Sequence, residues 1–174
     1  MRRLFELIFR NGMSKSIKDT ANCLVGVIAD THGLIRPEAK EALKGVELIL
    51  HAGDIGKPQV LEELEAIAPV IAIRGNIDKG QWAEAIPEYR NFEIGAVSIY
   101  ILHDVKELDF EPAVTGFKVV ISGHSHKALV QERKGVLFLN PGSAGPRRFK
   151  LPVSIALLRV NGETVNANIV QLLV

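Results

Sequence analysis

The 174-residue sequence predicts a single α/β domain that contains two packed sheets. Apolar, strand-like runs alternate with amphipathic helical stretches in the first half of the chain, which is typical of β-α-β units and a parallel sheet. Short strand-like segments joined by turn signals fill the second half. No repeat, low-complexity tract or linker divides the sequence. We therefore expect one domain over residues 23–174, preceded by an extension over residues 1–22.

The first half contains three predicted strands and two predicted helices. The run 24–29 is continuously apolar, as expected of a strand that is buried on both faces. Pro37 stands in the first turn of the next segment and Gly45 follows its end, which favours a short helix. Apolar residues recur along one face of the second helical stretch. The predicted strands are 24–29, 46–50 and 70–73, and the predicted helices are 36–44 and 58–68.

The second half predicts largely antiparallel strand pairing. Gly95-Ala96 and Asn161-Gly162 each separate two strand-like runs. Asn-Gly is the strongest short signal for a two-residue hairpin turn, so we expect hairpins around both positions. The predicted strands are 92–94, 97–102, 119–122, 128–132, 136–139, 154–160 and 164–172.

Composition excludes several classes of protein. The 21 basic and 20 acidic residues leave a net charge of +1, so we expect no stable nucleic-acid partner. No run approaches the ~18–20 apolar residues of a membrane helix. Glu6 and Arg10 break the apolar start of the chain too early for a signal peptide. Cys23 is the only cysteine, which excludes an intramolecular disulfide and favours a reducing compartment. We therefore expect a cytoplasmic protein without a membrane partner.

Polar side chains of the metal-binding types stand directly after the predicted strands. In open α/β sheets, ligands bind outside the carboxyl ends of the strands, so side chains that are distant in sequence meet there. Four of the five histidines follow the last apolar residue of a predicted strand by one to five residues and stand with the residues listed below. The polar residues in such places are Asp30, His32, Asp54, Asn76, Asp78, His103, His124 and His126.

This set predicts a metal centre. Carboxylates, imidazoles and an amide oxygen, without a thiolate, suit manganese, iron or zinc. The set is too large for one four-coordinate ion and suits two ions that share a carboxylate. Two ions ~3.5–4 Å apart clamp the attacking and leaving oxygens of phosphoryl transfer and lower the pKa of a bridging water. The sequence carries no P-loop, dinucleotide fingerprint or Gly-x-Ser-x-Gly element that would predict another chemistry.

The same residues form an ordered series of motifs that resembles that of the calcineurin-like metallophosphoesterases. The motifs are Asp30-Thr-His32, Gly53-Asp54, Gly75-Asn76, His103 after a strand, and Gly123-His124-Ser-His126. The chain is also similar to the small bacterial and archaeal phosphodiesterases of this superfamily in its Asn-Pro-Gly-Ser segment, residues 140–143. The resemblance runs from Leu24 to the end of the chain. It implies a four-layer α/β/β/α sandwich with two mixed sheets.

The resemblance further implies a role for each residue. Asp30, His32, Asp54 and His126 would hold a first divalent ion, and Asp54, Asn76, His103 and His124 would hold a second. Family members commonly use manganese, and others use iron, zinc or nickel. Asp54, the bridge between the ions, and Asn76 are the predicted catalytic residues. Arg74 and Asn76 are the predicted substrate-binding residues. His51 could orient Asp54 without contacting the ions itself, or it could be a buried histidine of its strand with no role in the site.

Two positions depart from the family pattern. Ile77 stands where many members carry a histidine that protonates the leaving group, and isoleucine cannot transfer a proton. General acid catalysis contributes about 10²–10⁴ in rate, so its loss disfavours leaving groups of high pKa. The small phosphodiesterases often lack this histidine too. The second departure is His103-Asp104-Val105, where many relatives read His-Gly-His.

We therefore expect a two-metal phosphoesterase, and specifically a phosphodiesterase, in which a metal-bridging hydroxide attacks phosphorus. Its substrate would be a small-molecule phosphate ester. Two alternatives stay open: a phosphomonoesterase, and a non-catalytic metal-binding or protein-interaction scaffold on the same fold, such as the retromer subunit of the superfamily. Small members of the family often self-associate, so we also expect a homo-oligomer.

Overall fold

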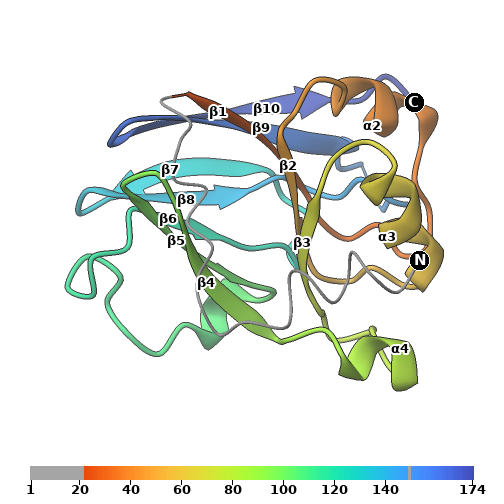
Figure 1. Cartoon of the computed structure of the whole chain (residues 1–174). Helices are drawn as coiled ribbons and strands as arrows, with labels where there is room; N and C mark the ends of the chain where they lie inside the picture. The colour runs from red at the N-terminus through yellow and green to blue at the C-terminus, as the bar shows by residue number, and fades with distance from the viewer. Residues whose placement is uncertain (1–21, 149) are drawn as a thin grey trace.

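The computed structural model describes residues 22–148 and 150–174 and contains two five-stranded sheets that pack face to face (Figure 1). Both sheets mix parallel and antiparallel pairs, which confirms the predicted α/β class with two mixed sheets. Of the predicted extension over residues 1–22, only Asn22 belongs to the described residues.

The first sheet joins the beginning of the domain to its end, in the order β10-β9-β1-β2-β3. The pairs β1–β2 and β2–β3 are parallel, and Val27 lies opposite Leu50. The hairpin predicted at Asn161-Gly162 forms between β9 and β10. The strands are β1 (Cys23–Ile28), β2 (Leu48–Ala52), β3 (Val70–Ile73), β9 (Ser154–Asn161) and β10 (Thr164–Gln171).

The second sheet, in the order β4-β5-β6-β8-β7, corrects the expectation of largely antiparallel pairing. Its central strands β5, β6 and β8 are parallel, and only the edge pairs are antiparallel. Parallel neighbours need a crossover connection, which residues 103–118 provide between β5 and β6. The carboxyl ends of β5 and β6 therefore share one edge. The strands are β4 (Tyr89–Ile94), β5 (Val97–Leu102), β6 (Val119–Ile121), β7 (Leu129–Arg133) and β8 (Val136–Asn140).

Two short helices, α2 (Pro37–Ala42) and α3 (Pro58–Glu65), lie on the outer side of the first sheet (Figure 1). Each begins at a proline, whose fixed φ suits the first helical turn. Both end earlier than the predicted 36–44 and 58–68, because their last predicted residues form turns. Two further elements are too short for a periodic sequence signal: α4 (Gln81–Glu84) and the 3-10 turn η1 (Val105–Glu107).

The main core lies between the two sheets, and a second core lies between the first sheet and its helices. Residues of β2 alternate between them, with Leu50 in the first and Ile49 in the second. The outer layer over the second sheet consists of the loop that contains η1, from which Leu108 packs near Val120. Among the residues that the structure describes, no helix is long and apolar enough to cross a membrane.

Candidate metal centre

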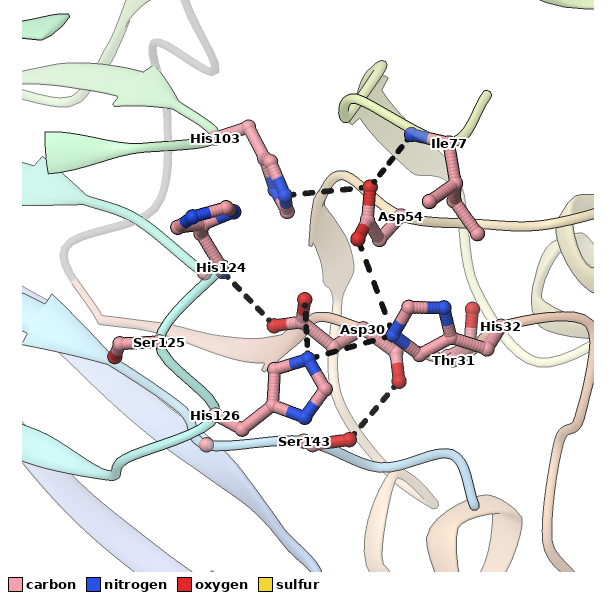
Figure 2. A network of polar contacts seen from close by, with 12 residues as sticks. Asp30, Thr31, His32, Asp54, Ile77, His103, His124, Ser125, His126 and Ser143 are labelled. Atoms are coloured by element: carbon pink, nitrogen blue, oxygen red, sulfur yellow. Dashed lines mark hydrogen bonds and ion pairs between the residues drawn. The ribbon is translucent and has the colours of Figure 1, made fainter. Parts of the chain in front are cut away.

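All seven predicted metal ligands follow strands, and the structure brings their side chains to one edge of the two-sheet sandwich. Figure 2 shows Asp30, His32, Asp54, His103, His124 and His126 around a common centre. Asp30 and His32 follow β1, Asp54 follows β2, Asn76 follows β3, His103 follows β5, and His124 and His126 follow β6. Ligand atoms of Asp30, His32 and His126 lie within 4.8 Å of one another, and so do those of Asp30, Asp54 and His103.

Most of these side chains stand on backbone that ordinary residues rarely adopt. Five of the six non-glycine residues with positive φ in the described part of the chain are predicted ligands. A left-handed residue of this kind costs about 1–3 kcal/mol and persists only where its surroundings hold it. The fold therefore uses strained turns to aim these groups. The five are Asp30 (φ 52°), His32 (47°), Asp54 (55°), His124 (64°) and His126 (58°).

In the first half of the centre, carboxylate oxygens and imidazole nitrogens lie close together. The Nε2 atoms of His32 and His126 face each other at 3.4 Å. Asp30 Oδ1 is buried and accepts no hydrogen bond within the described residues, although His126 Nε2 lies 3.2 Å away. Asp54 Oδ2 lies 3.9 Å from His32 Nε2. Two carboxylates and two imidazoles arranged in this way fit a cation.

The second half of the centre is built around Asn76. Its Oδ1 lies 3.1 Å from His103 Nε2 and 3.2 Å from His124 Nδ1. The Ala52 carbonyl lies 2.7 Å from His103 Nδ1, and since a carbonyl only accepts, this nitrogen donates and Nε2 faces the centre. Asp54 Oδ1 lies 3.3 Å from the same Nε2. Asp54 thus turns one oxygen toward each half, which suits a bridging ligand.

The charges around Asp54 favour its ionised form. Burial raises its pKa, but the hydrogen bond and charge of His103 and the Ile77 N–H outweigh burial, so the pKa lies below its ordinary value. Burial lowers the pKa of His103, but its bonds to Asp54 and the Ala52 carbonyl outweigh this effect, and the pKa is raised. A proton on His103 is thereby stabilised at a position where a metal ion would compete with it.

Asp78 has a positioning role that the sequence did not specify beyond placing it after a strand. Its buried carboxylate accepts hydrogen bonds from the backbone N–H groups of Ile55 (3.0 Å), Gly56 (2.7 Å) and Gly75 (2.8 Å). The loop after β3 is thus bound to the loop that carries Asp54. Charge-assisted bonds of this kind are roughly twice as strong as neutral ones.

The Asn-Pro-Gly-Ser segment, residues 140–143, joins the two sheets beneath the centre. Asn140 Nδ2 donates to the Gly123 carbonyl at 2.6 Å and to Ser125 Oγ at 3.2 Å. Ser143 Oγ donates to the Asp30 carbonyl at 3.0 Å. The loop of His124 and His126 is therefore fixed relative to the loop of Asp30 and His32.

Two other candidate residues, His51 and Arg74, contact groups outside the cluster of ligands. The Nε2 of His51 lies 2.9 Å from the Thr31 hydroxyl, so His51 supports the Asp30–His32 turn rather than Asp54. Arg74 forms an ion pair with Glu88 at 2.8 Å, and its predicted contact with substrate stays a prediction. Arg148 lies close enough to His32 to lower its pKa, an effect second to that of burial.

We expect Gly75→Ala to weaken metal binding. Gly75 has an ordinary φ, but a Cβ there would overlap the carboxylate and backbone nitrogen of Asp54. Overpacking of this kind costs about 1–3 kcal/mol of stability, and displaced ligand geometry costs about 10- to 100-fold in metal affinity. Urea unfolding of metal-free protein and calorimetric titration with Mn²⁺ measure the two quantities.

Gly135→Ala is the matched control for this substitution. Gly135 has a φ of 76° and no neighbouring atoms within 4 Å of an added Cβ. The control should lose stability through backbone strain and keep its metal affinity. Parental metal affinity in Gly75→Ala would contradict the role given to this close approach.

We expect His51→Gln to flatten the acid dependence of stability. Burial lowers the pKa of His51 to about 3. As the pH falls below 6.5, the pKa of His51 in the unfolded chain, the unfolded chain binds a proton that the folded chain does not bind. Stability is therefore lost between about pH 6.5 and 3. At pH 5 the loss is about 2 kcal/mol. The glutamine amide of the variant keeps a donor for Thr31 and does not titrate. Urea unfolding of metal-free protein at pH 7.5 and 5.0 measures the free energy of unfolding of the parent and of His51→Gln. If both proteins lost the same stability between the two pH values, His51 would take up its proton in the folded state as well.

Comparison with known proteins agrees with this geometry. A probable metallophosphoesterase of Methanothermobacter thermautotrophicus is 39% identical over 160 residues, which cover 85% of this chain and 92% of that protein. A phosphodiesterase of Methanocaldococcus jannaschii is 30% identical over 137 residues, 68% of this chain and 82% of that protein. The crystal structure of Vps29 from Chaetomium thermophilum shares the fold, with a TM-score of 0.70 at 24% identity, over 85% of this chain and 97% of that one.

The family model for the calcineurin-like phosphoesterase superfamily domain matches residues 24–163, which include all seven predicted ligands. The matched region begins in β1 and ends at the hairpin of β9 and β10. With both the family model and the archaeal relatives in agreement, the chain belongs to the calcineurin-like phosphoesterase superfamily.

Proposed function

We propose that the chain is a metal-dependent phosphodiesterase that works with two divalent ions. The observation that carries the proposal is the cluster of lone pairs at the strand ends. His32 and His126 turn nitrogens toward each other, and Asp30 Oδ1 accepts no hydrogen bond within the described residues. A buried carboxylate oxygen without a hydrogen-bond partner is costly unless a cation binds it. The donor types, carboxylate, imidazole and amide, are those that hold Mn, Fe or Zn.

The residues divide between the two ions as their contacts suggest. Asp30, His32, Asp54 and His126 would hold the first ion, and Asp54, Asn76, His103 and His124 would hold the second. When bound, such a pair of ions polarises the phosphate and lowers the pKa of a bound water. We propose manganese as the usual metal, with iron, zinc or nickel as alternatives, since cellular supply decides as much as ligand type.

The chain's own side chains orient the ions and the substrate. Asp54 presents Oδ1 to the His103 half and Oδ2 to the His32 half, and the Ile77 N–H holds Oδ1 at 3.2 Å. Asn76 turns its oxygen to the imidazoles and carries an amide N–H₂ that can donate to a nonbridging phosphate oxygen. Asp54 and Asn76 are therefore the proposed catalytic residues, and Arg74 and Asn76 the proposed substrate contacts.

The residue after Asn76 favours diesters whose leaving group needs no protonation. Ile77 offers only its backbone N–H, which is bonded to Asp54. Its apolar side chain is exposed beside the centre and cannot act as a general acid. The named phosphodiesterase of Methanocaldococcus jannaschii supports the same class of substrate.

We expect Asp54→Asn to reduce Mn²⁺-dependent hydrolysis of bis-p-nitrophenyl phosphate by at least about 10³-fold, since electrostatic groups at a reacting centre each contribute 10²–10³ and Asp54 serves both ions. The initial rate of nitrophenolate release measures the effect. The matched control is Asp109→Asn, which removes one carboxylate from the exposed loop after η1. Full activity in Asp54→Asn would refute the mechanism.

Rates on two related substrates should distinguish a diesterase from a monoesterase. With equal enzyme and Mn²⁺, we expect kcat/KM for bis-p-nitrophenyl phosphate to exceed that for p-nitrophenyl phosphate by about tenfold or more, as a diesterase requires. Both esters release p-nitrophenolate, so the ratio reports the class of ester and not the supply of a proton. The reverse order would favour the phosphomonoesterase alternative.

The scaffold alternative has one observation in its favour, the similarity of fold to Vps29. Metal analysis of protein purified without chelator tests it. Less than one ion per chain, together with no hydrolysis of either ester, would favour an interaction module over an enzyme. The assembled ligands, of which five stand on strained backbone, argue for the enzyme.

A further inference from the structure

Asp104 stands next to a predicted ligand and contacts another one across the centre. It directly follows His103 at the end of β5, and its Oδ2 lies 3.6 Å from Nε2 of His124, which follows β6. We propose that Asp104 is a positioning residue for the second ion: its carboxylate faces Nε2 of His124 and so keeps Nδ1 of the ring turned toward the centre, where it can serve as a ligand. The proposal rests on the two-ion function proposed above.

The two nitrogens of His124 have different surroundings. Nδ1 lies 3.2 Å from Asn76 Oδ1 at the centre, and Nε2 faces Asp104. The backbone N–H of His124 donates to Asp30 Oδ2 at 3.1 Å, which fixes the base of the side chain. A neutral imidazole carries its hydrogen on one of its two nitrogens, and the hydrogen-bond partners of the two nitrogens decide which one it is. Asn76 Oδ1 only accepts, so Nδ1 donates to it here, and an ion at the centre would take the place of that hydrogen. A carboxylate at Nε2 favours the form in which Nε2 keeps its hydrogen while Nδ1 binds the ion.

His124 needs such a partner more than the other imidazole of this half does. His103 is buried, and the Ala52 carbonyl fixes its proton on Nδ1. The His124 side chain is 43% exposed, and its ring packs edge-on against His103 with centroids 5.2 Å apart. Water therefore competes for its nitrogens. A carboxylate behind a metal-bound histidine is a common way to fix ring orientation, and its loss typically costs about 10- to 100-fold in metal affinity.

Asp104 is itself held in place. Its Oδ1 accepts from the Lys106 N–H at 3.0 Å and caps η1, which leaves Oδ2 to face His124. The double contact also complicates a simple deletion, because Asp104→Ala would remove the cap together with the partner of His124.

Three variants separate the two contacts. The serine of Asp104→Ser can cap η1 through its hydroxyl but is too short to reach His124. In Asp104→Asn the single amide oxygen can cap η1, which leaves an N–H₂ donor in place of the carboxylate oxygen that faces His124. Glu107→Gln removes a charge from the same turn and serves as the control.

The first measurement uses protein loaded with Zn²⁺, which is diamagnetic, and reports which nitrogen of His124 binds the ion. In ¹⁵N-histidine-labelled protein at pH 8, long-range ¹H–¹⁵N spectra should show a metal-bound Nδ1 and a protonated Nε2 on His124 in the parent and in Glu107→Gln. In Asp104→Ser and Asp104→Asn this pattern should be lost or mixed, with the signals assigned by their loss in His124→Gln. An unchanged Nδ1-bound pattern in both Asp104 variants would overturn the proposal.

The second measurement is calorimetric titration with Mn²⁺. Asp104→Ser and Asp104→Asn should weaken the second binding event about 10- to 100-fold and leave the first unchanged, and Glu107→Gln should leave both unchanged. Equal weakening of both events, or of neither, would overturn the proposal. A parent protein that binds only one ion would refute the two-ion function, whereas two binding events that the Asp104 variants do not alter would refute the role of Asp104 alone.

Discussion

The structure depends on one electrostatic constraint: carboxylate oxygens, imidazole nitrogens and an amide oxygen from several strand ends converge on one partly buried place. His32 and His126 turn their Nε2 atoms together at 3.4 Å, and Asn76 Oδ1 meets two imidazole nitrogens. Low local dielectric makes an arrangement of so many ligand atoms strongly attractive to a cation. Uptake of the proposed ions would therefore be coupled to folding, because the fold supplies the geometry that the ions need.

Holding this arrangement is the task of the surrounding polar contacts. Asp78 binds three backbone N–H groups in the loops after β2 and β3, and Ser143 and Asn140 connect the Asp30 loop to the loop after β6. Each contact lies where two strand ends approach closely. The left-handed residues show why this is necessary, since strained turns relax unless several bonds determine them together.

Sequence reasoning found the ligands because it needed only strand ends and residue types. The apolar runs before Asp30 and Asp54 located the edge of a parallel sheet without any coordinates. It mistook the pairing of the second sheet, since the hairpin signals there describe local turns, whereas the parallel neighbours β5, β6 and β8 depend on long-range packing. Asp78 was placed at a strand end but its role was not found, because three backbone N–H groups from two loops leave no sequence signature.

Burial divides the centre into two unequal halves, and the division explains where this chain differs from its family. Asp30, Asp54 and His126 are buried, so any ion they hold is enclosed by residues that the core fixes. Asn76 and His124 are exposed, so the second half faces solvent and substrate. Both departures from the family motifs, at Ile77 and at Asp104-Val105, flank this exposed half. Substitutions there change the protonation of the leaving group and the orientation of a ligand, and they leave the enclosed ligands intact. In this way one fold can keep its proposed metal chemistry while the esters that it cleaves change.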